Sequence, residues 1–298
     1  MSKIHQAIRR LEKLGSPDPT QSSTAQRDFI EGITKYIALS KNSDSTIQEL
    51  ERSEEAPLAF DLEPPKPMEL IIPSDSKLVA SLPSSSMASE RYRALKTKIF
   101  QMQEKRPLKT LLVTSASMSD GKTLTAINLA LTMAHEIDRR VLLVEADLRR
   151  PSFQRCLGIP ETLGLSDFLS ERCSLEQTLY KTNHRDLYLV PAGTVPENPA
   201  ELLNSQRMQR FLTHISERFN WVVVDSPPTV AVADADLLAG KVDGVIFVVR
   251  SSHTPTDLLT KSIESLKGKN LLGVVFNGYE DDEAKSYSSY YNYSGRKS

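Results

Sequence analysis

The sequence predicts an α/β fold in which a mostly parallel β-sheet is covered by helices on both faces. Six short segments are nearly continuous in apolar residues, and helical stretches separate them along the chain. Strands buried on both faces have this composition, and strands that alternate with helices are typical of parallel sheets. The six expected strands are 108–114, 141–146, 187–190, 221–225, 244–250 and 271–276.

Composition divides the chain into three parts. Residues 1–88 are rich in Pro, Ser and Thr, so we expect a largely disordered region with one short amphipathic helix near its start. Residues 89–278 carry the strand and helix patterns and form one domain with an ample core. Residues 279–298 hold five of the nine tyrosines and almost no aliphatic side chains, which predicts a flexible tail.

Charge and hydropathy favour a soluble, cytoplasmic protein. The 37 basic and 38 acidic residues give a net charge of −1, so no positive field attracts nucleic acid. No apolar run approaches the ~20 residues of a membrane span, and no signal peptide is visible. The two cysteines lie far apart in the sequence, and the five histidines have no metal-ligand spacing. We therefore expect reduced thiols and no zinc site.

The first long apolar strand leads into a phosphate-binding pattern. Residues 111–123 read LLVTSASMSDGKT and are followed by a helical pattern. A strand, a loop and a helix in this order are the context of a P-loop, whose backbone N–H groups point at phosphate oxygens. Lys122 is expected to reach the β- and γ-phosphates of ATP, and the Thr123 hydroxyl to ligate Mg²⁺. The expected nucleotide contacts are Ser117, Ser119, Asp120, Gly121, Lys122, Thr123 and Leu124.

Two later strands deliver acidic side chains to the same edge of the sheet. The run 141–144 is followed by Glu145 and Asp147, and the run 221–224 by Asp225. Ligands bind at the carboxyl ends of strands in open α/β sheets, and an acid that closes a strand is a usual Mg²⁺-side partner of a P-loop. Two acids separated by one residue point to the same side of an extended chain. These segments together predict a Mg-ATP site with Thr123, Asp147 and Asp225 as metal ligands.

The motifs SASMSDGKT, VLLVEADLRRP and VVVDSPP resemble those of the bacterial tyrosine kinases of exopolysaccharide synthesis, a branch of the ParA/MinD-like P-loop ATPases. The segment 189–208, LVPAGTVPENPAELLNSQRM, is similar to a further stretch of that family. The helix 89–100 resembles the family's Glu-x-x-Arg-x-x-Arg helix, with Glu90, Arg93 and Lys96 in its three positions. The resemblance covers about two thirds of the chain, from residue 89 to the C-terminus.

The resemblance implies a protein-tyrosine autokinase with ATP and Mg²⁺ as cofactors. Lys122 is then catalytic, and either Asp147 or Glu145 takes the proton of the acceptor phenol, a choice that the sequence leaves open. Arg149 is placed near the phosphates, and Asn277 near the adenine or in a turn cap. The family phosphorylates its own C-terminal tyrosines, which here are Tyr287, Tyr290, Tyr291 and Tyr293.

The same resemblance implies partners. The helix that carries Glu90, Arg93 and Lys96 mediates subunit contacts in the family, so we expect a homo-oligomer. Because no membrane span is visible, we expect activation by a separate membrane-anchored polysaccharide co-polymerase, which would hold the protein at the inner face of the membrane. A phosphotyrosine phosphatase would reset the tail. Two other functions stay open: a ParA/MinD-like ATPase without kinase activity, and a nucleotide-binding scaffold of a membrane complex.

Four residues depart from the family pattern. Met118 stands where Pro is usual. Ser119 stands where Gly is usual, and Ser costs more than Gly if that position requires a positive φ. Glu145 replaces the commoner Asp and reaches one methylene further. Lys96 replaces the last Arg of the helix motif and so loses bidentate geometry.

Overall fold

The computed structural model describes residues 65–230, 232–251 and 253–278. The amphipathic helix predicted near the start of the chain and the tyrosine tail lie outside these residues. Among the described residues, no helix is long and apolar enough to cross a membrane.

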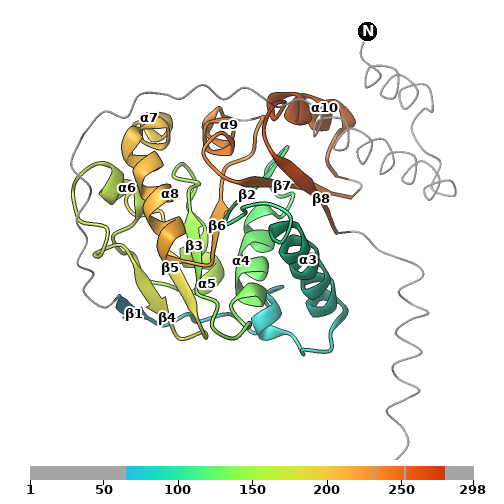
Figure 1. Cartoon of the computed structure of the whole chain (residues 1–298), viewed down its shortest axis with the longest axis horizontal. Helices are drawn as coiled ribbons and strands as arrows, with labels where there is room; N and C mark the ends of the chain where they lie inside the picture. Colours follow the sequence, from blue (N-terminus) through green and yellow to red (C-terminus); the bar gives the residue numbers. More distant parts are fainter. Residues whose placement is uncertain (1–64, 231, 252, 279–298) are drawn as a thin grey trace, which may run out of the picture.

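The sheet has eight strands in the order β1-β4-β5-β3-β6-β2-β7-β8, and every pair is parallel except β4 with β5 (Figure 1). This confirms the predicted α/β class. All six expected strands form, within two residues of their predicted ends. The strands are β1 Lys66–Met68, β2 Thr110–Ser115, β3 Val141–Glu145, β4 Tyr180–Thr182, β5 Leu187–Val190, β6 Trp221–Asp225, β7 Gly244–Arg250 and β8 Leu271–Asn277.

Helices cover both faces of the sheet (Figure 1). Alternate side chains of each strand enter two separate apolar cores: Leu111 and Val113 pack with α4, whereas Leu112 packs on the opposite face with α8. The side chains on helix α4 are buried along almost its whole length, as its apolar sequence requires. The helices are η1 Val79–Ser81, α3 Met87–Gln103, α4 Lys122–Met133, α5 Phe153–Leu157, α6 Leu165–Leu169, α7 Pro199–Asn204, α8 Gln206–Arg218, α9 Asp234–Ala239 and α10 Thr256–Ser265.

The predicted domain boundary at residue 89 is wrong, because residues 65–88 belong to the fold. Strand β1 lies at the edge of the sheet beside β4, and Leu70 and Leu78 are buried. The amide of Leu70 donates to Asn183 Oδ1 at 3.0 Å, which ties this segment to the turn after β4. The prolines around β1 give this segment the composition of a linker. An edge strand nevertheless tolerates proline, because the backbone groups on its outer side make no hydrogen bonds to a neighbouring strand. Strand β4 was also missed, since three residues are too short for a pattern.

The strand order places three carboxyl ends side by side. Strand β6 lies between β2 and β3, with Asp225 in register with Val113 on one side and with Glu145 on the other. The chain leaves β2 for α4 and β3 for α5 at this edge, so the topology itself gathers the motif residues.

Candidate active site

The loop between β2 and α4 has the left-handed backbone that phosphate loops use. Gly121, the N-cap of α4, has a φ of 96°, and a Cβ there would lie 1.9 Å from Asn277 Nδ2. Ser119 has a φ of 67°, so this Ser does occupy a position that favours Gly. The loop therefore keeps its shape through surrounding contacts, at a local backbone cost.

Asp120 and Asn277 supply those contacts from beneath the loop. The buried Asp120 carboxylate accepts from the Ser117 amide at 2.9 Å and from the Thr254 hydroxyl at 2.8 Å. Asn277 Nδ2 donates to the carbonyl of Asp120 at 2.9 Å. The side chains of three predicted nucleotide contacts thus stabilise the loop: these are Ser117, Asp120 and Asn277. Three others line the cavity above the loop: Ser119, Gly121 and Leu124.

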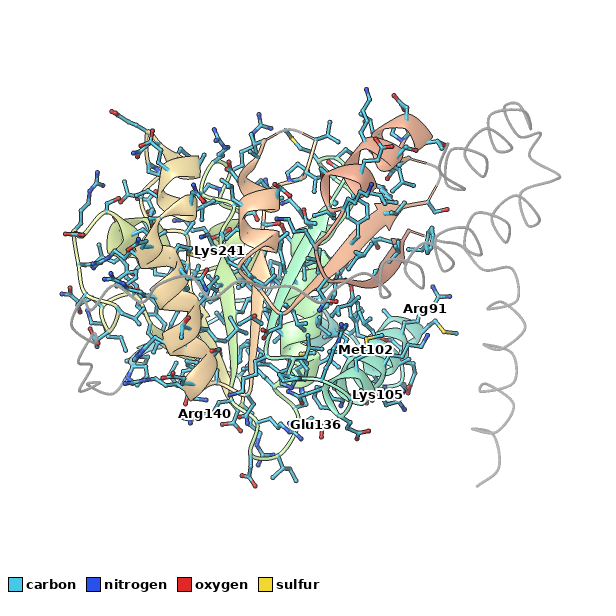
Figure 2. All side chains as sticks on the ribbon, turned by 45° about the horizontal axis from the view of Figure 1, so that its top comes forward. Arg91, Met102, Lys105, Glu136, Arg140 and Lys241 are labelled. Atoms are coloured by element: carbon cyan, nitrogen blue, oxygen red, sulfur yellow. The ribbon has the colours of Figure 1, made fainter. Side chains whose placement is uncertain are left out.

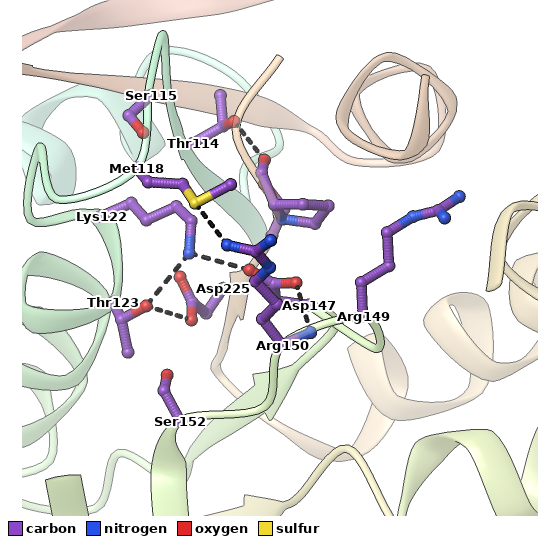
Figure 3. Close-up of polar contacts among 12 residues, drawn as sticks. Thr114, Ser115, Met118, Lys122, Thr123, Asp147, Arg149, Arg150, Ser152 and Asp225 are labelled. Carbon is purple, nitrogen blue, oxygen red and sulfur yellow. Dashed lines mark hydrogen bonds and ion pairs between the residues drawn. The ribbon is translucent and has the colours of Figure 1, made fainter. Parts of the chain in front are cut away.

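Four motif side chains meet at the start of α4 (Figure 3). Lys122 Nζ lies 3.0 Å from Asp147 Oδ2 and 3.3 Å from the Thr123 hydroxyl. The Thr123 hydroxyl donates to Asp225 Oδ2 at 2.7 Å. The structure therefore brings together Lys122, Thr123, Asp147 and Asp225, as the sequence predicted from three separate motifs.

Burial sets the electrostatics of this cluster. Burial raises the pKa of Asp225 to about 6, although Lys122 and the Thr123 hydrogen bond act against that rise. Burial also acts to lower the pKa of Lys122, but attraction to Asp225 and Asp147 outweighs it, so the pKa lies above its usual value. The ammonium is thus held charged beside carboxylates, ready to bind a further anion.

The oxygen atoms at this point fit a magnesium ion. Asp225 Oδ1 is buried and has no hydrogen-bond partner among the described residues, so one ligand position is open. No group of three or more His, Cys, Asp or Glu in the described part of the chain could hold a metal alone. Mg²⁺ needs no such cage, since one or two carboxylates plus substrate phosphates usually bind it.

Glu145 does not join the cluster, so its geometry favours Asp147 in the choice of base that the sequence left open between the two acids. Its Oε1 accepts from the amides of Ser152 and Phe153, the latter at 2.8 Å, and its Oε2 from the Ala192 amide at 3.2 Å. Burial raises its pKa to about 7, and these hydrogen bonds limit the rise. The expectation that Glu145 and Asp147 point to the same side fails because β3 ends at Glu145 and the chain at Asp147 is no longer a strand. Glu145 therefore contacts backbone amides, whereas Asp147 contacts Lys122.

Arg149 also departs from its predicted place at the phosphates. Its guanidinium forms two hydrogen bonds to the buried Asp234, at 2.8 and 3.1 Å, and points away from Lys122 (Figure 3). It still lines the edge of the cavity.

A cavity of about 670 Å³ opens over the cluster. Its walls come from the P-loop, from the turn between β3 and α5, and from the turn after β6. Sequence reasoning missed several of the lining residues, although the double Arg of VLLVEADLRRP was a visible signal. The missed residues are Met118, Arg150, Pro151, Ser152, Arg155, Cys156, Pro227, Pro228 and Val232.

The three residues predicted to mediate subunit contacts lie on α3, away from this cavity. Arg93 pairs with Glu90 at 2.7 Å on the same helix, and Lys96 pairs with Glu136, which follows α4. Figure 2 places Arg91 of the same helix and Lys105, which follows the helix, at the periphery of the molecule, where both side chains are exposed.

Comparison with known proteins agrees with this geometry. The family model described as an AAA domain matches residues 116–269. The tyrosine-protein kinase YwqD of Bacillus subtilis is 35% identical over 216 residues, which cover 72% of this chain and 90% of that protein.

Two solved structures share the fold. The crystal structure of the chimerical protein CapA2B2 has a TM-score of 0.65 and 27% identity, covering 73% of this chain and 95% of that chain. The kinase domain of the Escherichia coli tyrosine kinase ETK has a TM-score of 0.61 and 28% identity, covering 66% and 79%. With its P-loop, its strand-borne acids and these relatives, the chain belongs to the bacterial tyrosine-protein kinase family.

Proposed function

We propose that this protein is a Mg-ATP-dependent autokinase that phosphorylates the tyrosines of its own C-terminal tail. The observation that carries the proposal is the contact of Lys122 with Asp147 beside Asp225, at the N-terminus of α4. This arrangement offers a cation for phosphate, a carboxylate for a proton and oxygen ligands for a metal within one cavity.

The chain's own residues divide the work of phosphoryl transfer. The phosphates of ATP lie over the loop amides and the start of α4, and Lys122 turns from Asp147 to the β- and γ-phosphates. This movement frees the Asp147 carboxylate. Mg²⁺, when bound, would neutralise charge on the phosphates. Of the three predicted metal ligands, Thr123 and Asp225 would hold it, and Asp147 is assigned to the acceptor proton.

Asp147 is the proposed base because Glu145 is committed to backbone amides. The acceptor phenol transfers its proton to Asp147 while its oxygen forms a bond to the γ-phosphorus. The bond from that phosphorus to the bridging oxygen breaks, and ADP leaves with the electron pair. A carboxylate at this point helps because a phenol has a pKa near 10.

The cellular setting follows from the family. We propose that the kinase regulates exopolysaccharide synthesis or export, that a membrane-anchored co-polymerase activates it at the inner face of the membrane, and that a phosphatase resets the tail. Copies associate through Glu90, Arg93 and Lys96 on α3. The proposed acceptors are Tyr287, Tyr290, Tyr291 and Tyr293.

The test is incubation of the full chain with Mg-ATP, followed by mass spectrometry of the C-terminal peptide. A matched reaction uses Lys122→Met, which removes the ammonium and keeps an apolar side chain of similar length. Phosphate on the tail tyrosines that is lost in the variant supports the autokinase. ATP hydrolysis with an unmodified tail, even when the co-polymerase segment is added, would instead assign a ParA/MinD-like ATPase. Binding without turnover would assign a scaffold.

A further inference from the structure

Two arginines on the wall of the active-site cavity have no ion-pair partner among the described residues. Arg150 Nη1 lies 2.8 Å from the uncharged Sδ of Met118, and Arg155 interacts with the thiol of Cys156. Both arginines are exposed and line the cavity. The other cavity cations are neutralised, Lys122 by Asp147 and Arg149 by Asp234. The cavity wall therefore carries two positive charges that nothing in the described fold balances.

These charges lie on the Asp147 side of the cavity. The amide of Arg150 donates to Asp147 Oδ1 at 3.2 Å, so Arg150 is next to the proposed base. Arg155 is the third residue of α5, the helix that follows β3. Asn277 and the end of β8 lie on the other side of the P-loop, across β6, β2 and β7. A tyrosine bound at Asp147 therefore lies on the cavity wall that carries the two arginines.

The tail of this protein carries the matching charge. Residues 280–283 read EDDE, and Tyr287 follows this acidic run by four residues, a reach of about 13 Å in an extended chain. Arginine binds carboxylates with a planar fork of donors, which makes it well suited to an acidic peptide.

We propose that Arg150 and Arg155 bind the acidic run 280–283 of a second copy's tail and so hold its tyrosines at Asp147. The inference rests on the proposed function for its choice of substrate. A second copy is required because four strand spacings of about 4.8 Å separate β8 from β3, about 19 Å in all. Glu280 and Glu283 lie three and six residues beyond Asn277, so in a fully extended chain they reach about 10 and about 20 Å. Even full extension therefore brings only the last acid of the run as far as β3, and a chain does not lay the whole run along its own arginines.

The experiment measures tail binding directly, without phosphate transfer. A fluorescein-labelled peptide of residues 279–298 is titrated with the full-length chain in the presence of Mg-ADP, and binding is followed by fluorescence anisotropy. A second peptide replaces the four acids by Gln and Asn, which keeps their shape and removes their charge. The variants are Arg150→Ala with Arg155→Ala, and Arg185→Ala as the matched control outside the cavity. Affinity for a fluorescent ADP is measured for each.

We expect the double variant to bind the native peptide about tenfold more weakly, with the ADP affinity and the Arg185→Ala control unchanged. The neutral peptide should bind wild type and double variant equally. Equal binding of both peptides by wild type, or no binding at all, would overturn the inference. A fall in ADP affinity with unchanged peptide binding would also overturn it, because the arginines would then be nucleotide contacts. Because no phosphate transfer is needed, this result is separate from success or failure of the kinase assay.

Discussion

Two buried carboxylates lie in register on neighbouring strands but differ in how many hydrogen-bond partners their oxygens have. Glu145 ends β3 and both of its oxygens accept backbone amides, so it joins the start of α5 to the end of β5. Asp225 ends β6 and has one oxygen bonded to Thr123 and one without a partner among the described residues. A buried charge without its full set of partners is costly, and such costs are found where a ligand completes the set. From this difference we propose a structural role for Glu145 and a ligand-binding role for Asp225.

The largest effect is expected at Asp147, the third acid of this region, which lines the cavity and is the proposed base. Asp147→Asn keeps the shape and removes the proposed base together with the partner of Lys122. We expect tail phosphorylation to fall by about 10²–10⁴-fold, the range for loss of a general base. Single-turnover kinetics by mass spectrometry measure the effect. A normal rate in this variant would remove Asp147 from the mechanism.

Glu145→Gln should lower the stability of the protein and change its phosphorylation rate little, the reverse of what we expect for Asp147→Asn. The Gln amide can keep one set of acceptor contacts but places an N–H donor against the Ala192 amide, which leaves a buried donor unpaired. We expect the free energy of unfolding to fall by about 1–3 kcal/mol. Thermal unfolding would report a drop in Tm of about 2–4 °C per kcal/mol for a domain of this size. The phosphorylation rate at low temperature should change little; a loss as large as that of Asp147→Asn would restore Glu145 as a catalytic candidate.

Asp225→Asn should make the nucleotide-free protein more stable while weakening its use of Mg-ATP. The pKa of Asp225 is raised from 3.8 to about 6, so between these values the folded state binds more protons than the unfolded state. Stability due to this group therefore falls as pH rises from about 4 to about 6 and is level above that. Urea unfolding at a series of pH values should show that the free energy of unfolding falls less between about pH 4 and about pH 6 in the variant than in wild type. The same pH profile in both proteins would mean that ionisation of Asp225 does not destabilise the fold.

The smallest expected effect is at the P-loop itself. Ser119→Gly relieves a residue with a φ of 67° and should stabilise the protein by about 1 kcal/mol or less. Calorimetry would detect a rise in Tm of a few degrees. Ser119→Ala is the matched control, because it removes the hydroxyl but keeps the Cβ, and it should not be stabilising.

The sequence was sufficient for features that depend on local pattern. Apolar runs located six strands, and the positions next to those runs predicted that Lys122, Thr123, Asp147 and Asp225 would meet, as they do. Features that depend on distant residues were not predictable. The partner of Arg149 is 85 residues away at Asp234, and the amides that bind Glu145 come from α5 and from the end of β5. Strand β1 was missed because prolines near an edge strand read as a linker.

Asn277 joins the last strand to the nucleotide loop. Its side chain holds the carbonyl of Asp120, and it occupies the space that a Cβ at Gly121 would need. It is also the residue at which β8 ends and from which the tail departs after Gly278. Force or displacement at the root of the tail is therefore applied to the loop that cradles phosphate. If binding of the tail changes the affinity for nucleotide by some factor, binding of nucleotide changes the affinity for the tail by the same factor.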